Sequence, residues 1–265
     1  MKVLALDRPV PNLAQHREIK DQYRGHPIDT MNPMYNEPLV SVFEFGISGI
    51  SYYAKPNRAT GKPLPDVSPE PLVRLSVAEK LEVAKGRLWK SEELTRHLGG
   101  RAELIVKDAL RSQGLVSHLH DVVFPRILRE KYPDWDDESL EEERGKLISK
   151  PSGDASSPAP HTTGGAVDID LIREDGASVD FGHVLGSSDV SRTDYYEGRE
   201  STAEVAMNPF AKVVRRALYW SMTEQGFANH PYEFWHYSYG DQMWALFSQE
   251  PAAFYGAVEG SPDLS

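Results

Sequence analysis

The stretch Ala166-Val-Asp-Ile-Asp-Leu171 decides the fold class of this chain. Its large apolar residues, Val167, Ile169 and Leu171, alternate with an alanine and two aspartates. Because successive side chains of a strand point to opposite faces, the pattern predicts a strand with one apolar and one polar face. Asp168 lies on the polar face, so the sequence places a carboxylate on the surface of a sheet.

The elements around this strand are mixed and lack the regular alternation of a parallel sheet. Pro125 is expected to kink or divide one of the helices, because proline cannot donate a backbone hydrogen bond. The patterns predict strands at 39–42, 102–107 and, entered from a turn, 232–237, and helices at 77–89, 113–131, 136–148 and 208–226. Such a mixture predicts an α+β fold, with helices packed on a central, mostly antiparallel sheet. We expect a single domain over residues 37–248, between an irregular N-terminal lead-in (1–36) and a C-terminal tail (249–265).

Two of the predicted helices begin with typical capping residues. Ser76 and Glu79 have the spacing of a capping box, in which each side chain binds a backbone N–H of the other residue. Asn208 is a favoured N-cap residue, and proline at 209 fits the first helical turn. Before this helix, residues 182–205 are polar and contain glycine and serine, which predicts a long excursion and leaves open whether it acts as a lid.

The composition excludes several classes of protein. Hydrophobic residues make up 40% of the 265 residues and charged residues 26%, which is usual for a globular domain. A net charge of −11 repels phosphate backbones and anionic lipids, so we expect neither a nucleic-acid nor a membrane partner. The lack of cysteine excludes disulfides, thiolate metal sites and a cysteine nucleophile. With no apolar leader or membrane span in the sequence, we expect a cytoplasmic protein.

The first candidate for a chemical site is the segment His161-Thr-Thr-Gly-Gly-Ala-Val-Asp168. The histidine leaves a loop, the two glycines allow a turn, and the aspartate lies on the polar face of the predicted strand. This arrangement brings an imidazole nitrogen and a carboxylate oxygen together, as a metal site requires. Taken alone, the same segment also fits a surface loop that leads into an edge strand with an exposed aspartate.

The second candidate is the segment Glu233-Phe-Trp-His236. A histidine beside large aromatic residues can be a core histidine with satisfied hydrogen bonds. The glutamate is harder to explain in this way, because a buried carboxylate without a partner is unfavourable. A carboxylate walled by aromatic side chains is expected to have a raised pKa, which suits a general base near neutral pH.

Together the two segments supply three metal ligands, His161, Asp168 and His236, and a carboxylate, Glu233. Three protein ligands with an open fourth position are typical of a catalytic zinc site, which lowers the pKa of its bound water to roughly 7. Glu233 would accept the proton of that water and pass it to the leaving amine. In a chain without cysteine, ligands of these types suit Zn²⁺ or Fe²⁺.

Two further residues are weaker candidates. Arg111 follows the predicted strand at 102–107, so its side chain can point into a cleft and stabilise a developing oxyanion. The alternative for Arg111 is a salt bridge at the surface. His230 lies three residues before Glu233 and is a candidate for supporting the site without binding the metal.

The order and spacing of these motifs resemble the D-alanyl-D-alanine dipeptidases of the M15 metallopeptidase family. Tyr53-Ala54 and, six residues later, Gly61-Lys-Pro-Leu64 are similar to the family's Tyr-Ala and Gly-Arg-Pro-Leu element. Asp108-Ala-Leu-Arg111 lies where the family has Asp-Gly-Tyr-Arg-Pro. The helix at 208–226 and the Glu-Phe-Trp-His segment after it occupy the place of the family's helix and Glu-Trp-Trp-His block. The resemblance covers about residues 37–240.

The resemblance implies one zinc ion per chain, held by His161, Asp168 and His236. It also implies that Glu233 is the catalytic acid and base and that Arg111 stabilises the transition state. The implied reaction is hydrolysis of a small peptide substrate, typically a dipeptide of D-amino acids such as D-Ala-D-Ala. The implied fold is a small α+β domain around an antiparallel sheet.

The sequence departs from the family pattern close to the first histidine, the aspartate and the arginine. Ala159 stands where a serine is usual, and Asp170 stands where a threonine is common. Ala109, Leu110 and Ser112 replace the residues that flank the arginine in the family. The metal and base positions are intact, so these departures affect the identity of the substrate and leave the peptidase chemistry in place.

Three other functions are compatible with the sequence. The first is the same chemistry on a different dipeptide or on an amide. The second is an iron oxygenase, since two histidines and one carboxylate also serve that class. Those enzymes place the first histidine and the carboxylate one residue apart, whereas six residues separate His161 and Asp168. The third is a metal-binding module without catalysis, which needs neither Glu233 nor Arg111.

Overall fold

The computed structural model describes residues 4–55, 64, 67–148, 150–182, 188–197 and 208–258. The helices are α1 (Ala14–Ile19), α2 (Leu75–Trp89), α3 (Glu92–Leu98), α4 (Gln113–His118), α5 (Phe124–Lys131), α6 (Asp137–Leu147), α7 (Ser188–Ser191), α9 (Pro209–Thr223) and α10 (Gln242–Ser248). The strands are β1 (Leu39–Ser41), β2 (Ser48–Gly49), β3 (Leu72–Arg74), β4 (Ala102–Asp108), β5 (Ala166–Arg173), β6 (Ala228–Asn229) and β7 (His236–Ser238).

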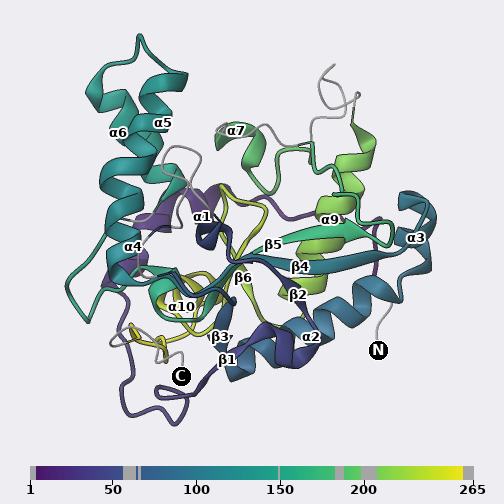
Figure 1. Cartoon of the computed structure of the whole chain (residues 1–265), viewed down its shortest axis with the longest axis horizontal. Coiled ribbons are helices and arrows are strands. Elements are labelled where there is room, and N and C mark those ends of the chain that lie inside the picture. Colours follow the sequence, from purple (N-terminus) through teal and green to yellow (C-terminus); the bar gives the residue numbers. More distant parts are fainter. Residues whose placement is uncertain are drawn as a thin grey trace.

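The main sheet has the strand order β2-β4-β5-β7-β6 and lies at the centre of the molecule (Figure 1). Strand β2 is parallel to β4, and the other neighbours are antiparallel. Strands β1 and β3 form a separate antiparallel pair. The predicted α+β fold with a mostly antiparallel sheet is therefore confirmed.

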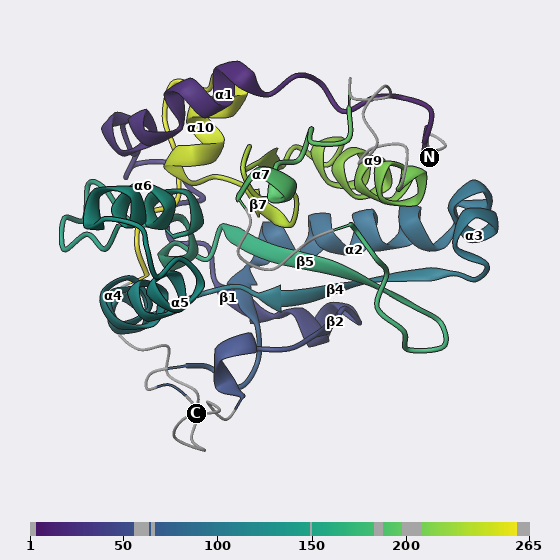
Figure 2. The ribbon, with the colours of Figure 1, turned by 90° about the horizontal axis from the view of Figure 1, so that it is seen from above.

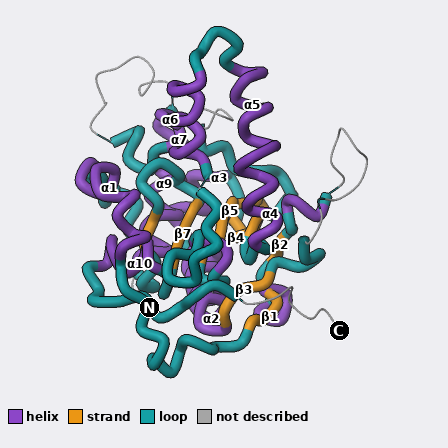
Figure 3. The backbone as a smooth tube through the Cα atoms, turned by 90° about the vertical axis from the view of Figure 1, so that its left-hand side faces the viewer, coloured by secondary structure: helices purple, strands orange, loops and turns teal. Residues whose placement is uncertain are grey.

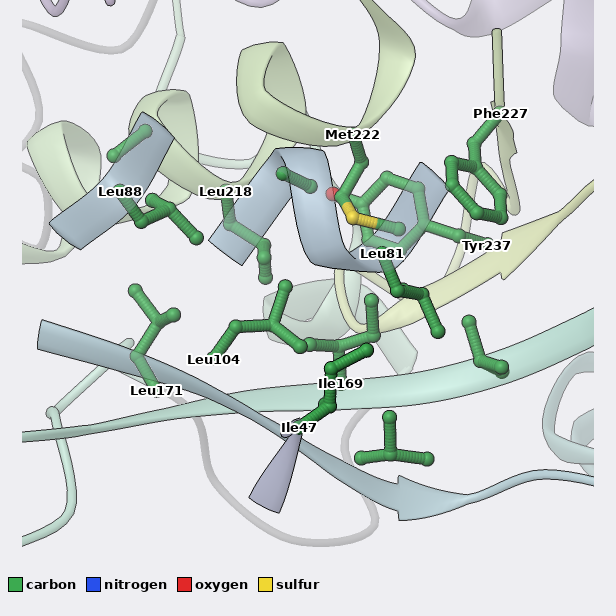
Figure 4. Close-up of a cluster of buried hydrophobic side chains, with 14 of the residues drawn as sticks. Ile47, Leu81, Leu88, Leu104, Ile169, Leu171, Leu218, Met222, Phe227 and Tyr237 are labelled. Atoms are coloured by element: carbon green, nitrogen blue, oxygen red, sulfur yellow. The ribbon is translucent and has the colours of Figure 1, made fainter. Parts of the chain in front are cut away.

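Helices α2 and α9 pack against each other and cover one face of the sheet (Figure 2). The apolar side chains of β4 and β5 point toward these helices, and those of Leu104 and Ile169 are almost completely buried (Figure 4). Leu81 of α2 and Leu218 of α9 meet them from the other side. Each such side chain stabilises the fold by roughly 1.5–3 kcal/mol through removal of apolar surface from water. The alternation predicted for β5 is confirmed.

The helical region after β4 is divided near Pro125, as the sequence predicts. Helix α4 continues into one π-helical turn (Leu119–Val123), and α5 begins at Phe124 with the proline in its first turn. Proline is tolerated there, because the first N–H groups of a helix have no partner within the helix. Helices α5 and α6 then pack side by side as a hairpin that projects from the body of the molecule (Figures 1 and 3).

The helix predicted at 77–89 is confirmed as α2, but its predicted capping box is wrong. The helix begins at Leu75, so Ser76 lies inside its first turn. The Ser76 backbone N–H and hydroxyl both donate to the carboxylate of Glu37, at 3.1 and 2.6 Å. Strand β3 leads directly into the helix. The Glu37 carboxylate, which is distant in the sequence, accepts a backbone N–H of the first helical turn in place of a local cap. The Asn208 cap is confirmed, since its Oδ1 accepts the Ala211 N–H at 2.8 Å.

The lead-in at 1–36 is partly helical, so the expectation of irregular structure was wrong for Ala14–Ile19 and Lys20–Gly25. This segment is held by distant partners: Asp194 accepts the Leu13 N–H at 3.0 Å and pairs with Arg17 at 2.9 Å. Long-range contacts of this kind leave no periodicity in the sequence. The domain boundaries after residues 36 and 248 stay a prediction.

Two other sequence features fall partly or wholly outside the described residues. The predicted excursion at 182–205 is described only at 182 and 188–197, which include α7. Residues 61–63 of the Tyr-Ala…Gly-Lys-Pro-Leu element are likewise not described. Among the helices that the structure describes, none has both the length and the apolar character needed to cross a lipid bilayer.

Candidate metal centre

Sheet register and two glycines bring the three predicted ligands together. Strands β5 and β7 pair so that Asp168 lies opposite His236. His161 lies in a 3₁₀ turn (Pro160–Thr162) just before β5. Gly164 turns the chain with a φ of +74°. A Cβ on Gly165 would collide with the carbonyl oxygen of Tyr239, the residue that follows β7. The close approach explains why this turn uses glycine.

The three candidate ligand atoms form a compact triangle. His161 Nε2 is 3.2 Å from His236 Nδ1 and 3.4 Å from Asp168 Oδ1, and His236 Nδ1 is 3.1 Å from that same oxygen. A tetrahedral zinc ion about 2.0–2.1 Å from each ligand separates the ligand atoms by about 3.3 Å. The spacing thus fits a metal ion, and these three residues could hold one.

Hydrogen bonds to neighbouring groups orient two of the ligands. His161 Nδ1 lies 2.7 Å from the Ala109 carbonyl oxygen, which can only accept, so Nδ1 carries the proton and Nε2 keeps its lone pair. Asp168 Oδ2 accepts a hydrogen bond from Arg111 Nη2 at 3.3 Å, which leaves Oδ1 on the side of the histidines. Burial opposes ionisation of Asp168, but the adjacent His161 and His236 hold its pKa well below the ordinary value.

Arg111 lies beside the cluster in a network of carboxylates. Its Nε donates to Asp108 Oδ2 at 2.6 Å, its guanidinium lies 5.3 Å from the centre of the Tyr53 ring, and its side chain is only 11% exposed. Burial alone would lower the pKa of Arg111, but Asp108, Tyr53 and Asp168 together raise it above its ordinary value. The alternative of a simple surface salt bridge is wrong, because this cation is held next to the candidate ligands.

Glu233 lies next to the same cluster, in the turn that precedes β7. Its Oε2 is 3.7 Å from His236 Nδ1, and 12% of its side chain is exposed. Burial raises the pKa of Glu233 to about 8, and the negative charge of Asp168 adds to the effect. Arg111, His161 and Lys20 act in the opposite direction. The raised pKa expected for this carboxyl is confirmed, and burial is its main cause.

His230 also lies at the centre, as its position before Glu233 suggests. Its Nδ1 is 4.0 Å from Glu233 Oε2, and its ring meets that of His236 edge to face with 5.6 Å between ring centres. Burial holds the pKa of His230 well below its ordinary value. His230 is therefore a neutral imidazole at neutral pH, beside the candidate base.

The structure brings three further residues to this centre that no sequence pattern singled out. Lys20, from the predicted lead-in, approaches the Tyr232 ring to 5.9 Å and lowers the pKa of Glu233. Ser238 Oγ lies 3.4 Å from His236 Nε2, and Asp241 follows just after it. The alternation of side chains in β7 puts Ser238 on the same face as His236, so the sequence pattern could have predicted its position beside the histidine. Lys20 lies in a segment without a recognised pattern.

Fold and site together have the architecture of a metallopeptidase. A model of the peptidase M15 family, described as D-Ala-D-Ala dipeptidase, matches residues 98–254. This match covers more than half of the sequence and includes every candidate ligand, so the chain belongs to the peptidase M15 family. Its members are metal-dependent, in agreement with the cluster of two histidines and an aspartate.

Individual proteins are also similar to this chain. A D-alanyl-D-alanine dipeptidase from Synechocystis sp. (strain ATCC 27184 / PCC 6803 / Kazusa) is 30% identical over 167 residues. The aligned region is 60% of this chain and spans 61% of the length of that relative. A solved structure of the LdcB LD-carboxypeptidase is 15% identical, with 83% of this chain and 78% of that chain covered and a TM-score of 0.33.

Proposed function

We propose that this chain is a zinc-dependent dipeptidase that hydrolyses a D,D-dipeptide such as D-Ala-D-Ala. The observation that carries the proposal is the position of Glu233. A carboxyl group that is only 12% exposed lies 3.7 Å from a nitrogen of a cluster whose spacing fits a tetrahedral metal, and burial raises its pKa in the metal-free chain. Metal binding alone requires no such group, whereas hydrolysis requires a base beside the metal.

In this proposal His161, Asp168 and His236 bind one zinc ion. The ion supplies Lewis acidity, which activates water near neutral pH and polarises the peptide carbonyl. Glu233 accepts a proton from the attacking water and delivers it to the leaving amine, for which a pKa near the working pH is the best compromise. Arg111, held cationic by its carboxylate neighbours, stabilises the negative charge that develops on the carbonyl oxygen.

The proposed substrate class draws on the family and on the relative named a D-alanyl-D-alanine dipeptidase. Two of the departures from the family pattern have little effect on the metal site itself. Ala109 contacts His161 through its backbone carbonyl, and Ala159 accepts the Thr162 N–H through its own. Both contacts run through the backbone, so neither hydrogen bond involves the side chain that departs from the family pattern. The runner-up function is the same chemistry on another dipeptide or amide.

A hydrolysis screen over D,D-, L,D- and L,L-dipeptides tests the substrate, and metal analysis of the purified chain tests the cofactor. We expect about one zinc per chain and a preference for D,D-dipeptides. Glu233→Ala should abolish hydrolysis and retain zinc, whereas Glu82→Gln, a change on the exposed side of α2, should leave both unchanged. Full activity of the Glu233 variant, or iron with oxygen-dependent turnover, would refute the proposal. The cytoplasmic location and the lack of a nucleic-acid partner stay predictions.

A further inference from the structure

The second candidate histidine ligand, His236, requires a hydrogen-bond partner that fixes its tautomer. A neutral imidazole has one proton, and His236 faces the cluster through Nδ1, so the proton has to reside on Nε2. His161 has the opposite arrangement, and its Nδ1 proton is held by the Ala109 carbonyl. A metal-binding histidine nearly always donates its other N–H to a carboxylate, a carbonyl or water. The Nε2–H group of His236 therefore requires a hydrogen-bond acceptor.

The group next to His236 Nε2 is the hydroxyl of Ser238. The two residues are two apart on β7, so their side chains lie on the same face of the sheet. The Ser238 Oγ is 3.4 Å from His236 Nε2, and the serine is completely buried. A hydroxyl can accept from the imidazole N–H and donate its own proton onward, so a further acceptor is expected behind it.

Asp241 supplies that acceptor. Gly240, with a φ of +74°, turns the chain immediately after β7, and a Cβ at this position would collide with the rings of Phe254 and Tyr255. The turn brings Asp241 back beside the end of the strand, where only 1% of it is exposed. Burial raises the pKa of the Asp241 carboxyl, whereas the Trp244 N–H and the Ser238 hydroxyl act to lower it.

The two oxygens of Asp241 have different surroundings. Oδ1 accepts the Trp244 N–H at 2.8 Å and so caps α10. Oδ2 is buried and has no partner with good hydrogen-bond geometry in the parts of the chain that the structure describes. Asparagine caps a helix about as well as aspartate and avoids the unfavourable burial of a charge. Capping therefore explains Oδ1 and leaves the charge and the second oxygen unexplained.

We propose that Asp241, acting through the Ser238 hydroxyl, holds the proton of His236 on Nε2 and thereby presents Nδ1 to the metal. His236 Nε2–H donates to Ser238 Oγ, and the Ser238 hydroxyl donates to the Asp241 carboxylate. Asp241 and Ser238 are positioning residues, since neither touches the metal or the substrate. The inference rests on the metal ligands of the proposed function and does not depend on which dipeptide is hydrolysed.

Zinc affinity of the metal-free protein, measured by competition with a chromophoric chelator, tests this relay. Asp241→Asn keeps the helix cap and removes the charge, and Ser238→Ala removes the hydroxyl. Each should weaken zinc binding by about 10–100-fold, the range found when such partners of metal ligands are changed. Ser238→Thr keeps a hydroxyl and should retain most of the affinity. Asp136→Asn, the same change at the exposed cap of α6, is the matched control and should have no effect.

A double-mutant cycle and a stability measurement separate the relay from a merely structural role. If the residues act in series, Asp241→Asn combined with Ser238→Ala should weaken zinc binding little more than either change alone. The urea midpoint of metal-free Asp241→Asn should stay close to that of the unchanged protein, because asparagine preserves the cap. Wild-type zinc affinity in both single variants, or losses that simply add, would overturn the inference. A chain that binds zinc normally but hydrolyses no D,D-dipeptide would refute the proposed substrate and leave this inference intact.

Discussion

Replacing Glu233 with glutamine should stabilise the metal-free protein at neutral pH. The carboxyl group has a pKa of about 8 in the folded chain, against an ordinary value of 4.5. Below pH 4.5 it is protonated in both the folded and the unfolded state and has no effect on stability. Between pH 4.5 and 8 the unfolded chain releases the proton while the folded chain keeps it, so the free energy of unfolding falls as the pH rises.

The size of the effect follows from the pKa difference. Each pH unit between the two values lowers the unfolding free energy by about 1.4 kcal/mol. At pH 7 the penalty for Glu233 is therefore about 3 kcal/mol at most, a large share of the usual stability of a domain. Glutamine has nearly the same shape and no charge to bury, so the variant avoids the penalty. A bound zinc ion should shrink the difference, because its charge favours the ionised carboxylate.

Urea unfolding of chelator-treated protein, followed by tryptophan fluorescence at several pH values, measures this effect. The stability difference between Glu233→Gln and the unchanged protein should be near zero at pH 4 and grow toward pH 8. Glu82→Gln, at an exposed position of α2, serves as the control and should show no such trend. A variant that is no more stable at pH 7, or a difference independent of pH, would show that this carboxyl is not held neutral by burial.

Three further changes test other parts of the structure. Arg111→Lys should lower kcat by about 10²–10³-fold and leave zinc content unchanged, because lysine lacks the planar fork that binds two carboxylates. The measurement is steady-state kinetics of the zinc-loaded variant, and a normal kcat would contradict this prediction. Gly165→Ala should lower the unfolding free energy by about 1–3 kcal/mol, since its Cβ would collide with the Tyr239 carbonyl oxygen. Glu37→Ala should cost about 1 kcal/mol in urea unfolding, because the Ser76 N–H at the start of α2 loses its acceptor.

Much of the fold was predictable because the relevant signals are local. The alternation in Ala166–Arg173 and the cap at Asn208 involve residues close together in the chain, and both are confirmed. The prediction of a capping box at Ser76 was wrong because a residue distant in sequence replaces the local partner. The residues of the predicted box have the right local spacing, but the acceptor that reaches the helix start is Glu37, 39 positions away. Local patterns cannot show such a competitor.

The sequence by itself determined which residues are candidates for the centre: His161, Asp168, His236, Glu233 and Arg111. Only the tertiary structure placed the ligand atoms 3.1–3.4 Å apart and buried the glutamate enough to raise its pKa to about 8. It also supplied the Ala109 carbonyl that orients the first histidine, a contact that no side-chain pattern encodes. Residue types are fixed by the chain, but distances, tautomers and desolvation arise only when segments distant in sequence pack together.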